Sequence, residues 1–279
     1  MASLLKQWLD MKPSTPKIVW AEFDGYARKV FANDPTDWYA DAAGYAGAII
    51  QAHSIIPSHC VTFDLLAPFL FRPECTIRSP SELLVQLDNP TILNFVEDVL
   101  NALSHRFNDH ADLILKVQSA ADLVTFIDES LECDFDTLDE LSSVSAGLIR
   151  RFSDKGVSGL VLARQGVHSI SLDEVDAYQP LFSIAKHYDW LTGLEFSGIS
   201  NGPLEAEGLD ADFWLAPDFP VFALATGSYV KPVGGGLTAN FWNGDERIEN
   251  VGSGFLYGTV PVNCEPESVL SAVRGLRIG

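Results

Sequence analysis

Short apolar runs alternate with longer amphipathic stretches along most of this chain. The runs are rich in β-branched and aromatic residues, which favour strands, and the first covers residues 17–22. The others cover residues 60–64, 112–117, 159–164, 190–196, 211–216, 221–225 and 254–258. Because predicted helices separate most of these runs, the order strand, loop, helix recurs, and this order places strands in parallel.

Local capping signals mark where several helices begin. Ser79 with Glu82, Thr137 with Glu140, and Ser171 with Glu174 match the box in which a hydroxyl and a carboxylate satisfy free amide groups. Pro266, between two glutamates, suits the first turn of a last helix. Further helices are predicted over residues 36–51, 91–107 and 120–131, after an amphipathic opening around residues 4–8.

Eight strands in 279 residues predict an α/β protein with a single (β/α)8 TIM barrel. Closure of the barrel removes both sheet edges, and the length suits one barrel of about 250 residues. Length alone also allows two smaller domains, but no linker rich in Pro, Ser or charge divides the chain. We therefore expect one barrel domain over residues 1–279, with an N-terminal helical extension.

Composition narrows the range of partners. The formal charge of −20 disfavours binding to nucleic acid, and 47% hydrophobic residues exclude global disorder. No apolar run reaches the roughly 18 to 20 residues of a membrane span, and no signal-peptide cleavage site follows the N-terminus. We expect a soluble, cytoplasmic protein without membrane contact. Its four cysteines lie far apart with no CxxC pair, which predicts free thiols.

Charged and polar residues stand where the predicted strands end, the place where barrels of this type hold their reacting groups. Lys116 and Arg164 each end an apolar strand and can hold a substrate carboxylate, or else form structural ion pairs with Glu195 or Asp64. Asp64 can act as acid or base, or can cap the loop after its strand. Gln118 and Glu195 complete the predicted binding set.

Two loops offer further candidates. The acidic and aromatic stretch of residues 22–28 carries Tyr26 and Arg28 and can close over a ligand, or lie in solvent with Tyr26 packed inward. His168 lies in a loop that we expect to face the mouth, where a neutral imidazole suits proton transfer near pH 7. A surface or capping histidine is the alternative.

Other motifs carry less chemistry. The glycine-rich residues 233–237 resemble a phosphate-cradling loop but lack its Lys-Ser/Thr, so a flexible loop is the alternative. His59 and Cys60 are neighbours on a strand and point to opposite faces, which prevents them from sharing one metal ion. We expect neither a metal nor a cofactor.

Three stretches together carry a resemblance to a known family: residues 61–64, residues 152–164 with the capped helix that follows, and the ending from residue 254 to 269. In layout, nearly the whole chain resembles the uroporphyrinogen decarboxylase superfamily. That superfamily includes the decarboxylase, corrinoid-dependent methyltransferases and, more distantly, cobalamin-independent methionine synthase. The resemblance implies the barrel and a homodimer, and Asp64 falls where the family's pyrrole-binding aspartate lies.

The chain also departs from the family's motifs. The decarboxylase holds porphyrinogen carboxylates with N-terminal arginines, whereas residues 21–28 here are mostly acidic or apolar, and its late Gly-His pair is Gly258-Thr259. The methyltransferases bind zinc through a His-x-Cys pair, and the matching residues 193–198 contain neither His nor Cys. The zinc site is therefore expected to be absent.

The favoured hypothesis is a lyase that decarboxylates a small anionic substrate, aromatic or pyrrole-type, without a metal. Lys116 and Arg164 would orient the carboxylate, Asp64 would handle the proton, and Tyr26 or His168 would assist. One alternative is methyl transfer with a corrinoid protein as partner. The other is a non-catalytic barrel that binds a metabolite or a partner protein.

Overall fold

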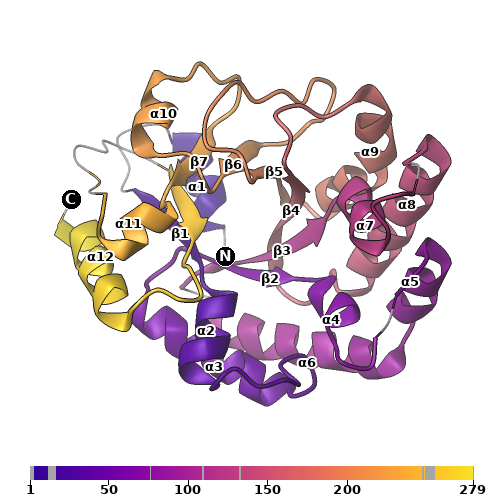
Figure 1. Cartoon of the computed structure of the whole chain (residues 1–279), viewed down its shortest axis with the longest axis horizontal. Coiled ribbons are helices and arrows are strands. Elements are labelled where there is room, and N and C mark those ends of the chain that lie inside the picture. Colours follow the sequence, from indigo (N-terminus) through magenta and orange to yellow (C-terminus); the bar gives the residue numbers. More distant parts are fainter. Residues whose placement is uncertain are drawn as a thin grey trace.

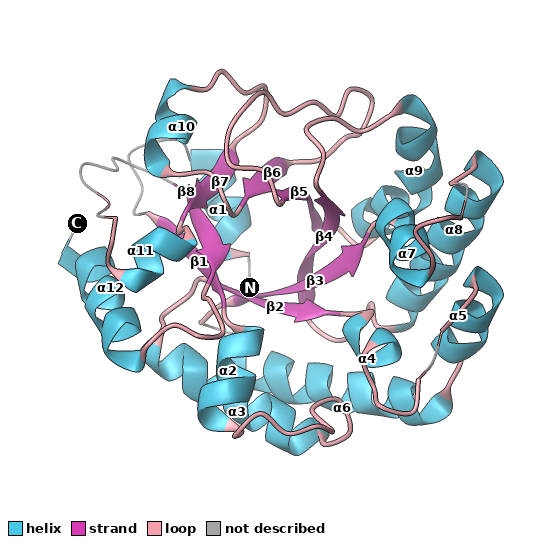
Figure 2. Cartoon of the chain, in the orientation of Figure 1, coloured by secondary structure: helices cyan, strands magenta, loops and turns pink. Residues whose placement is uncertain are grey.

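Eight parallel strands form a nearly closed barrel with helices around it, which confirms the predicted (β/α)8 TIM barrel (Figures 1 and 2). The computed structural model describes residues 3–11, 17–75, 77–108, 110–131, 133–246, 248 and 255–278. The strands are β1 Ile18–Glu22, β2 Cys60–Asp64, β3 Asp112–Gln118, β4 Val157–Gln165, β5 Leu191–Ser197, β6 Phe213–Ala216, β7 Val233–Gly236 and β8 Phe255–Thr259.

Helices lie outside the ring of strands and on its C-terminal face (Figure 2). Those of the first half are α2 Asp24–Phe31, α3 Ala42–Ile55, α4 Ala67–Leu70, α5 Pro80–Leu87, α6 Pro90–Phe107 and α7 Ala120–Ile127. Those of the second half are α8 Phe135–Arg151, α9 Leu172–His187, α10 Val221–Thr226, α11 Ala239–Asn243 and α12 Pro266–Ile278. No helix in the described part of the chain is long and apolar enough to cross a membrane.

The predicted N-terminal extension is helix α1, Leu4–Met11, which lies behind the strands in Figure 1. Its Leu5 is fully buried and packs with interior side chains such as Trp20 and Phe213. The Asp112 carboxylate, at the start of β3, accepts from the Leu5 amide at 2.8 Å and from the Ser3 hydroxyl at 2.9 Å. The extension therefore closes the N-terminal end of the barrel.

The inside of the barrel is apolar near α1 and charged near the opposite end. Side chains alternate across a strand, so Glu22 follows Trp20 on the same face of β1, and Lys116 follows Ile114 on the same face of β3. Trp20 and Ile114 belong to one buried cluster inside the ring. The two-residue period thus places a charged layer directly above an apolar one.

The seam between β1 and β2, the two ends of the strand order, depends on side chains as well as backbone. The His59 amide donates to the Val19 carbonyl at 2.8 Å, and the Val19 amide donates back to His59 Nδ1 at 3.0 Å. Two residues further along β1, the Ala21 amide donates at 3.0 Å to the Oγ atom of Ser58, the residue before His59. His59 and Ser58 therefore supply acceptors that a strand ladder would otherwise provide.

Ser58→Ala is expected to lower the free energy of unfolding by about 1–3 kcal/mol, because the buried Ala21 amide loses its acceptor. Urea unfolding followed by circular dichroism measures the change. Ser54→Ala is the matched control, since the exposed Ser54 hydroxyl donates to the nearby Gln51 carbonyl and to no other described residue, and it should change stability by less than about 0.5 kcal/mol. Equal losses in both variants would contradict the role of Ser58 in the seam.

Residues predicted as the seventh strand, 221–225, form helix α10 instead. Strand β7 is made by Val233–Gly236, the run expected to be a loop. A Cβ atom at Gly234 would lie 3.1 Å from both Leu215 and Phe255, so the crowded interior favours glycine here. The prediction failed because β-propensity favoured the apolar run over the glycines.

Some of the predicted helix starts are confirmed and others are shifted. The full capping box at Ser171 and Glu174 is confirmed, and Ser79 caps α5. Thr137 is not a cap, because Asp134 accepts from the Thr137 amide and starts α8 three residues earlier. Helix α3 begins after Asp41 rather than at residue 36. Gly254, the predicted start of the last strand, lies outside the described residues.

Candidate functional site

Four carboxyl groups and one ammonium group gather at the C-terminal mouth of the barrel. Glu22, Asp64 and Glu195 come from the ends of β1, β2 and β5, and Lys116 comes from β3. Asp24, two residues after the end of β1, is the first residue of α2. Neighbouring parallel strands end at the same rim, which brings together residues far apart in sequence.

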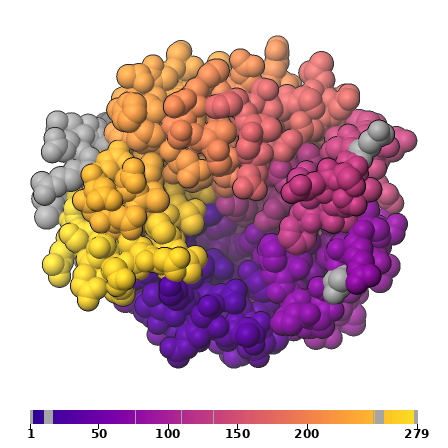
Figure 3. Space-filling model, in the orientation of Figure 1, coloured from indigo at the N-terminus to yellow at the C-terminus, as the bar shows by residue number. Residues whose placement is uncertain are grey.

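A pocket of about 160 Å³ opens beside these groups. Glu22, Asp24, Asp64 and Lys116 line it, and Tyr39 and Phe71 supply aromatic walls. Figure 3 shows a hollow near the centre of this face, bordered by the indigo and purple atoms of the first part of the chain. The pocket is thus small, acidic and partly aromatic.

Lys116 is paired on two sides. Its Nζ lies 2.9 Å from Glu22 Oε2 and 2.7 Å from Glu195 Oε2, and the exposed fractions of these three side chains are 14%, 13% and 4%. Burial opposes the charge of Lys116, but the carboxylates of Glu195 and Glu22 outweigh it and hold the pKa of Lys116 above its ordinary value. The ammonium charge is therefore neutralised within the protein.

Glu195 is the most deeply buried of the carboxyl groups. The Tyr257 hydroxyl donates to the oxygen that also faces Lys116. Burial raises the pKa of Glu195 while Lys116 opposes this rise, and burial together with Glu195 raises the pKa of Tyr257. Lys116, Glu22, Glu195 and Tyr257 form one connected network, which we call the buried tetrad.

Asp64 both caps a loop and faces the pocket. Its Oδ1 accepts from the amides of Leu66 and Ala67, each at 3.1 Å, and its Oδ2 accepts from Gln118 Nε2 at 2.5 Å. Burial raises the pKa of Asp64, although Gln118 and Lys116 oppose the shift. Both interpretations of Asp64 from the sequence are thus compatible with its position, and its predicted catalytic role stays a prediction.

Asp24 is a pocket residue that sequence reasoning does not single out within the acidic stretch of residues 22–28. The buried Tyr45 hydroxyl donates to Asp24 Oδ1. Burial raises the pKa of Asp24 to about 6, and the charges of Asp64 and Glu22 add to this rise. Its position two residues after a strand-end glutamate is the sequence feature that indicates a place at the mouth. Its buried environment, however, results from packing against α3, which the sequence does not show.

Arg164 lies away from the mouth pocket, between the helices that cover β4. Its Nη1 lies 2.6 Å from Asp122 on α7 and its Nε lies 2.7 Å from Glu174 on α9. The guanidinium is therefore part of a structural ion-pair cluster, with partners other than the predicted Glu195 or Asp64. Arg164 does not line the mouth pocket with Lys116, so this placement does not bring the two together around one carboxylate, and the predicted substrate-binding role of Arg164 stays a prediction.

Three other predicted residues lie outside the described lining of the pocket. Tyr26 is buried and packs edge-to-face on Phe31, with a ring separation of 6.4 Å. Arg28 forms an ion pair with Asp34 at 2.7 Å. His168 is exposed, and its ring lies so close to Gly202 that a Cβ there would approach it to 2.9 Å. Of the predicted set, the pocket lining therefore includes Lys116 and Asp64. Glu195 and Gln118 lie outside this lining but pair with Lys116 and Asp64, respectively, whereas Tyr26, Arg28, His168 and Arg164 do neither.

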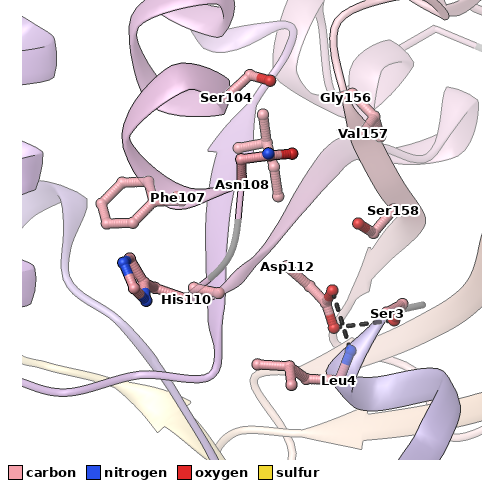
Figure 4. A pocket seen from close by; sticks show the side chains of 12 residues that line it. Ser3, Leu4, Ser104, Phe107, Asn108, His110, Asp112, Gly156, Val157 and Ser158 are labelled. Carbon is pink, nitrogen blue, oxygen red and sulfur yellow. Dashed lines mark hydrogen bonds between the residues drawn. The ribbon is translucent and has the colours of Figure 1, made fainter. Parts of the chain in front are cut away.

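A second cavity, of about 230 Å³, lies at the opposite end of the barrel (Figure 4). Ser104, His110, Asp112 and Ser158 are among the residues that line it. The Asp112 carboxylate is already bound by the start of α1, as the dashed lines in Figure 4 show. Because this end of a barrel serves stability rather than chemistry, the mouth pocket is the better candidate site.

Comparison with known proteins yields no match to a protein-family model or to a curated protein. Solved structures match in fold. A methyltransferase from Methanosarcina mazei is 11% identical, with 98% of this chain and 97% of that chain covered, at a TM-score of 0.64. The homocysteine methyltransferase MmuM from Escherichia coli, in its metallated form, is 10% identical, with 98% and 99% covered, at a TM-score of 0.57.

At these identities the comparisons show a shared fold. This chain is therefore a (β/α)8-barrel protein that is similar in architecture to two methyltransferases. One of those structures holds a metal. Among the described residues of this chain, no three His, Cys, Asp or Glu side chains come together as metal ligands.

Proposed function

We propose that this protein is a group-transfer enzyme of the methyltransferase type, whose substrate is a small organic cation bound in the mouth pocket. The observation that carries the proposal is the charge of the site: Glu22, Asp24 and Asp64 line the pocket with one ammonium, and Lys116 is already held by Glu22 and the buried Glu195. Desolvation strengthens the attraction of uncompensated carboxylates for a cation. An anion in the same place would meet repulsion.

Unpaired acceptors and aromatic walls support the same ligand class. Glu22 lines the pocket, and its Oε1 is buried with no hydrogen-bond partner among the described residues. The same holds for Oε1 of Gln118, which lies outside the lining and donates through Nε2 to the pocket residue Asp64. A buried acceptor left without a donor costs about 1–3 kcal/mol, and a ligand that carries N–H groups or a positive charge offsets that cost. Tyr39 and Phe71 present rings to the pocket, and aromatic faces attract organic cations.

The proposed reaction moves a methyl group from a sulfonium or ammonium donor to a thiol or amine acceptor. The bond from the methyl carbon to the donor heteroatom breaks, and the heteroatom keeps the electron pair. The acceptor lone pair forms the new bond, and the acceptor loses its proton to a base. Asp24 suits that role, because a pKa of about 6 leaves it ionised yet basic near neutral pH.

Decarboxylation, the hypothesis from the sequence, has less support. It requires free positive charge at the mouth, whereas Lys116 is neutralised and Arg164 is held between α7 and α9. The structural neighbours favour the group-transfer alternative by analogy of fold. A corrinoid partner protein and a homodimer stay predictions.

Calorimetric titration tests ligand class directly. The full-length protein is expected to bind tetramethylammonium and not acetate, and Asp64→Asn should weaken cation binding about tenfold, a loss of about 1.4 kcal/mol. Asp218→Asn is the matched control, since Asp218 is exposed, follows β6 and lies outside the described pocket lining. Selective binding of acetate would contradict the proposal.

Turnover is tested with methyl-deuterated sulfonium and ammonium donors and small thiols as acceptors. Mass spectrometry of the acceptor should show the intact CD3 group, and Asp24→Asn should lower the rate of transfer. Saturable cation binding without transfer to any acceptor would contradict the enzymatic part and favour the non-catalytic metabolite-binding barrel instead.

A further inference from the structure

Two exposed aromatic rings stand beside the mouth pocket. Phe71, which follows α4, is 53% exposed, and Phe126 on α7 is 49% exposed. Their ring centroids lie 5.5 Å apart in an edge-to-face arrangement, the geometry that aromatic pairs prefer. Phe69, two residues before Phe71, is fully buried, so the fold buries one aromatic of this segment and leaves the other in solvent.

Phe71 connects the pocket to the outer surface. Among the described residues that line the pocket, it is the exposed one, while the others are buried or half-buried. One side of Phe71 therefore faces the cavity and another meets Phe126. Scattered single apolar residues on a surface need no explanation, but this pair extends the wall of a cavity outward.

The size of the pocket sets what can lie inside it. A volume of about 160 Å³ suits a small charged head, so a longer substituent has to extend out of the pocket, and Phe71 is the lining residue exposed to solvent. A substituent that leaves beside Phe71 passes the Phe71 and Phe126 rings, which we call the aromatic lip. The acidic pocket and the aromatic lip thus form one continuous surface that is charged inside the cavity and apolar outside it.

We infer that the aromatic lip is a specificity determinant that selects organic cations carrying an apolar arm over small symmetrical cations. This inference rests on the proposed function, because it requires the cationic head to occupy the acidic pocket. Burial of an apolar arm against the two rings stabilises the complex in proportion to the area removed from water. The substrate class is accordingly an amphiphilic ammonium or sulfonium compound.

Calorimetry of the full-length protein with tetramethylammonium and hexyltrimethylammonium tests the inference. The wild type should bind the hexyl compound at least about tenfold more tightly, since several methylene groups leave water. Phe71→Ala should remove most of this preference and Phe126→Ala part of it. Affinity for tetramethylammonium should fall by less than about threefold in Phe71→Ala, because only a cation–π contact is lost.

Phe222→Ala is the matched control, because Phe222 is 70% exposed on α10 and lies outside the described pocket lining. It should keep the full preference for the hexyl compound. Binding of tetramethylammonium with no gain from the hexyl arm, or a preference retained in Phe71→Ala, would overturn the inference alone. Failure of both cations to bind would overturn the proposed function and the inference with it.

Discussion

Lys116→Met is expected to lower the free energy of unfolding by about 3–5 kcal/mol at neutral pH, the range seen when one partner of a buried ion pair is removed. The substitution leaves Glu22 and Glu195 facing each other without the ammonium that now lies 2.9 and 2.7 Å from them. Methionine roughly fills the volume of the lysine stem, so the loss reports charge rather than a cavity. Urea unfolding followed by circular dichroism gives the value.

The loss should depend on pH with a definite sign. Burial raises the pKa of Glu195 in the folded protein, and removal of Lys116, which opposes that rise, raises it further. A group whose pKa is higher in the folded than in the unfolded state stabilises the fold below its unfolded pKa, and this contribution is lost as pH rises through the folded value. Lys116→Met should therefore gain stability, relative to the wild type, as pH falls from 8 to 5.

Two further variants separate this explanation from a general effect of losing a lysine. Lys116→Met combined with Glu195→Gln should recover part of the lost stability, because one buried charge is removed. Lys186→Met breaks an exposed ion pair with Asp210 and should cost less than about 1 kcal/mol. A pH-independent loss in Lys116→Met, unchanged by Glu195→Gln, would contradict the charge network.

The fold was largely predictable because its signals are local. Parallel strands buried on both faces appear as continuous apolar runs, and seven of the eight strands lie where such runs predicted them. The exception, β7, contains three glycines, and its strand conformation is imposed by the neighbouring Leu215 and Phe255 rather than by its own propensity. The conformation of such a segment is determined by tertiary packing, which cannot be recognised from the sequence pattern.

The candidate site was predictable in position but not in charge balance. The barrel rule places Lys116 and Asp64 at the mouth, as expected from the ends of their strands. Arg164 ends a strand in the same way, but the alternation of side chains turns it outward to Asp122 and Glu174. Whether a strand-end side chain faces the pocket or an outer ion pair thus depends on a shift of one residue along the strand. The ends of strands are also the boundaries that a sequence defines least well.

As the pH rises toward 6, the affinity for a cation is expected to increase by up to about tenfold per pH unit, because Asp24 becomes negatively charged in this range. Burial raises the pKa of Asp24 to about 6, so the group is neutral below that pH and an anion above it. Tetramethylammonium is the suitable ligand, since its own charge does not change with pH. Its dissociation constant, measured by calorimetry between pH 5 and 8, should level off above pH 7.

Asp24→Asn should remove much of this dependence and weaken binding at pH 7 about tenfold, while keeping the shape of the side chain. Asp64 also faces the pocket with a raised pKa and accounts for the dependence that remains, whereas Tyr39 and Tyr45, whose pKa values are raised above 10, stay neutral throughout. Asp37→Asn, an exposed change in the turn between α2 and α3, should leave the profile intact. A profile equally steep in Asp24→Asn would show that Asp24 does not contact the cation, because a carboxyl group that titrates beside a bound charge has to transmit its ionisation to the affinity.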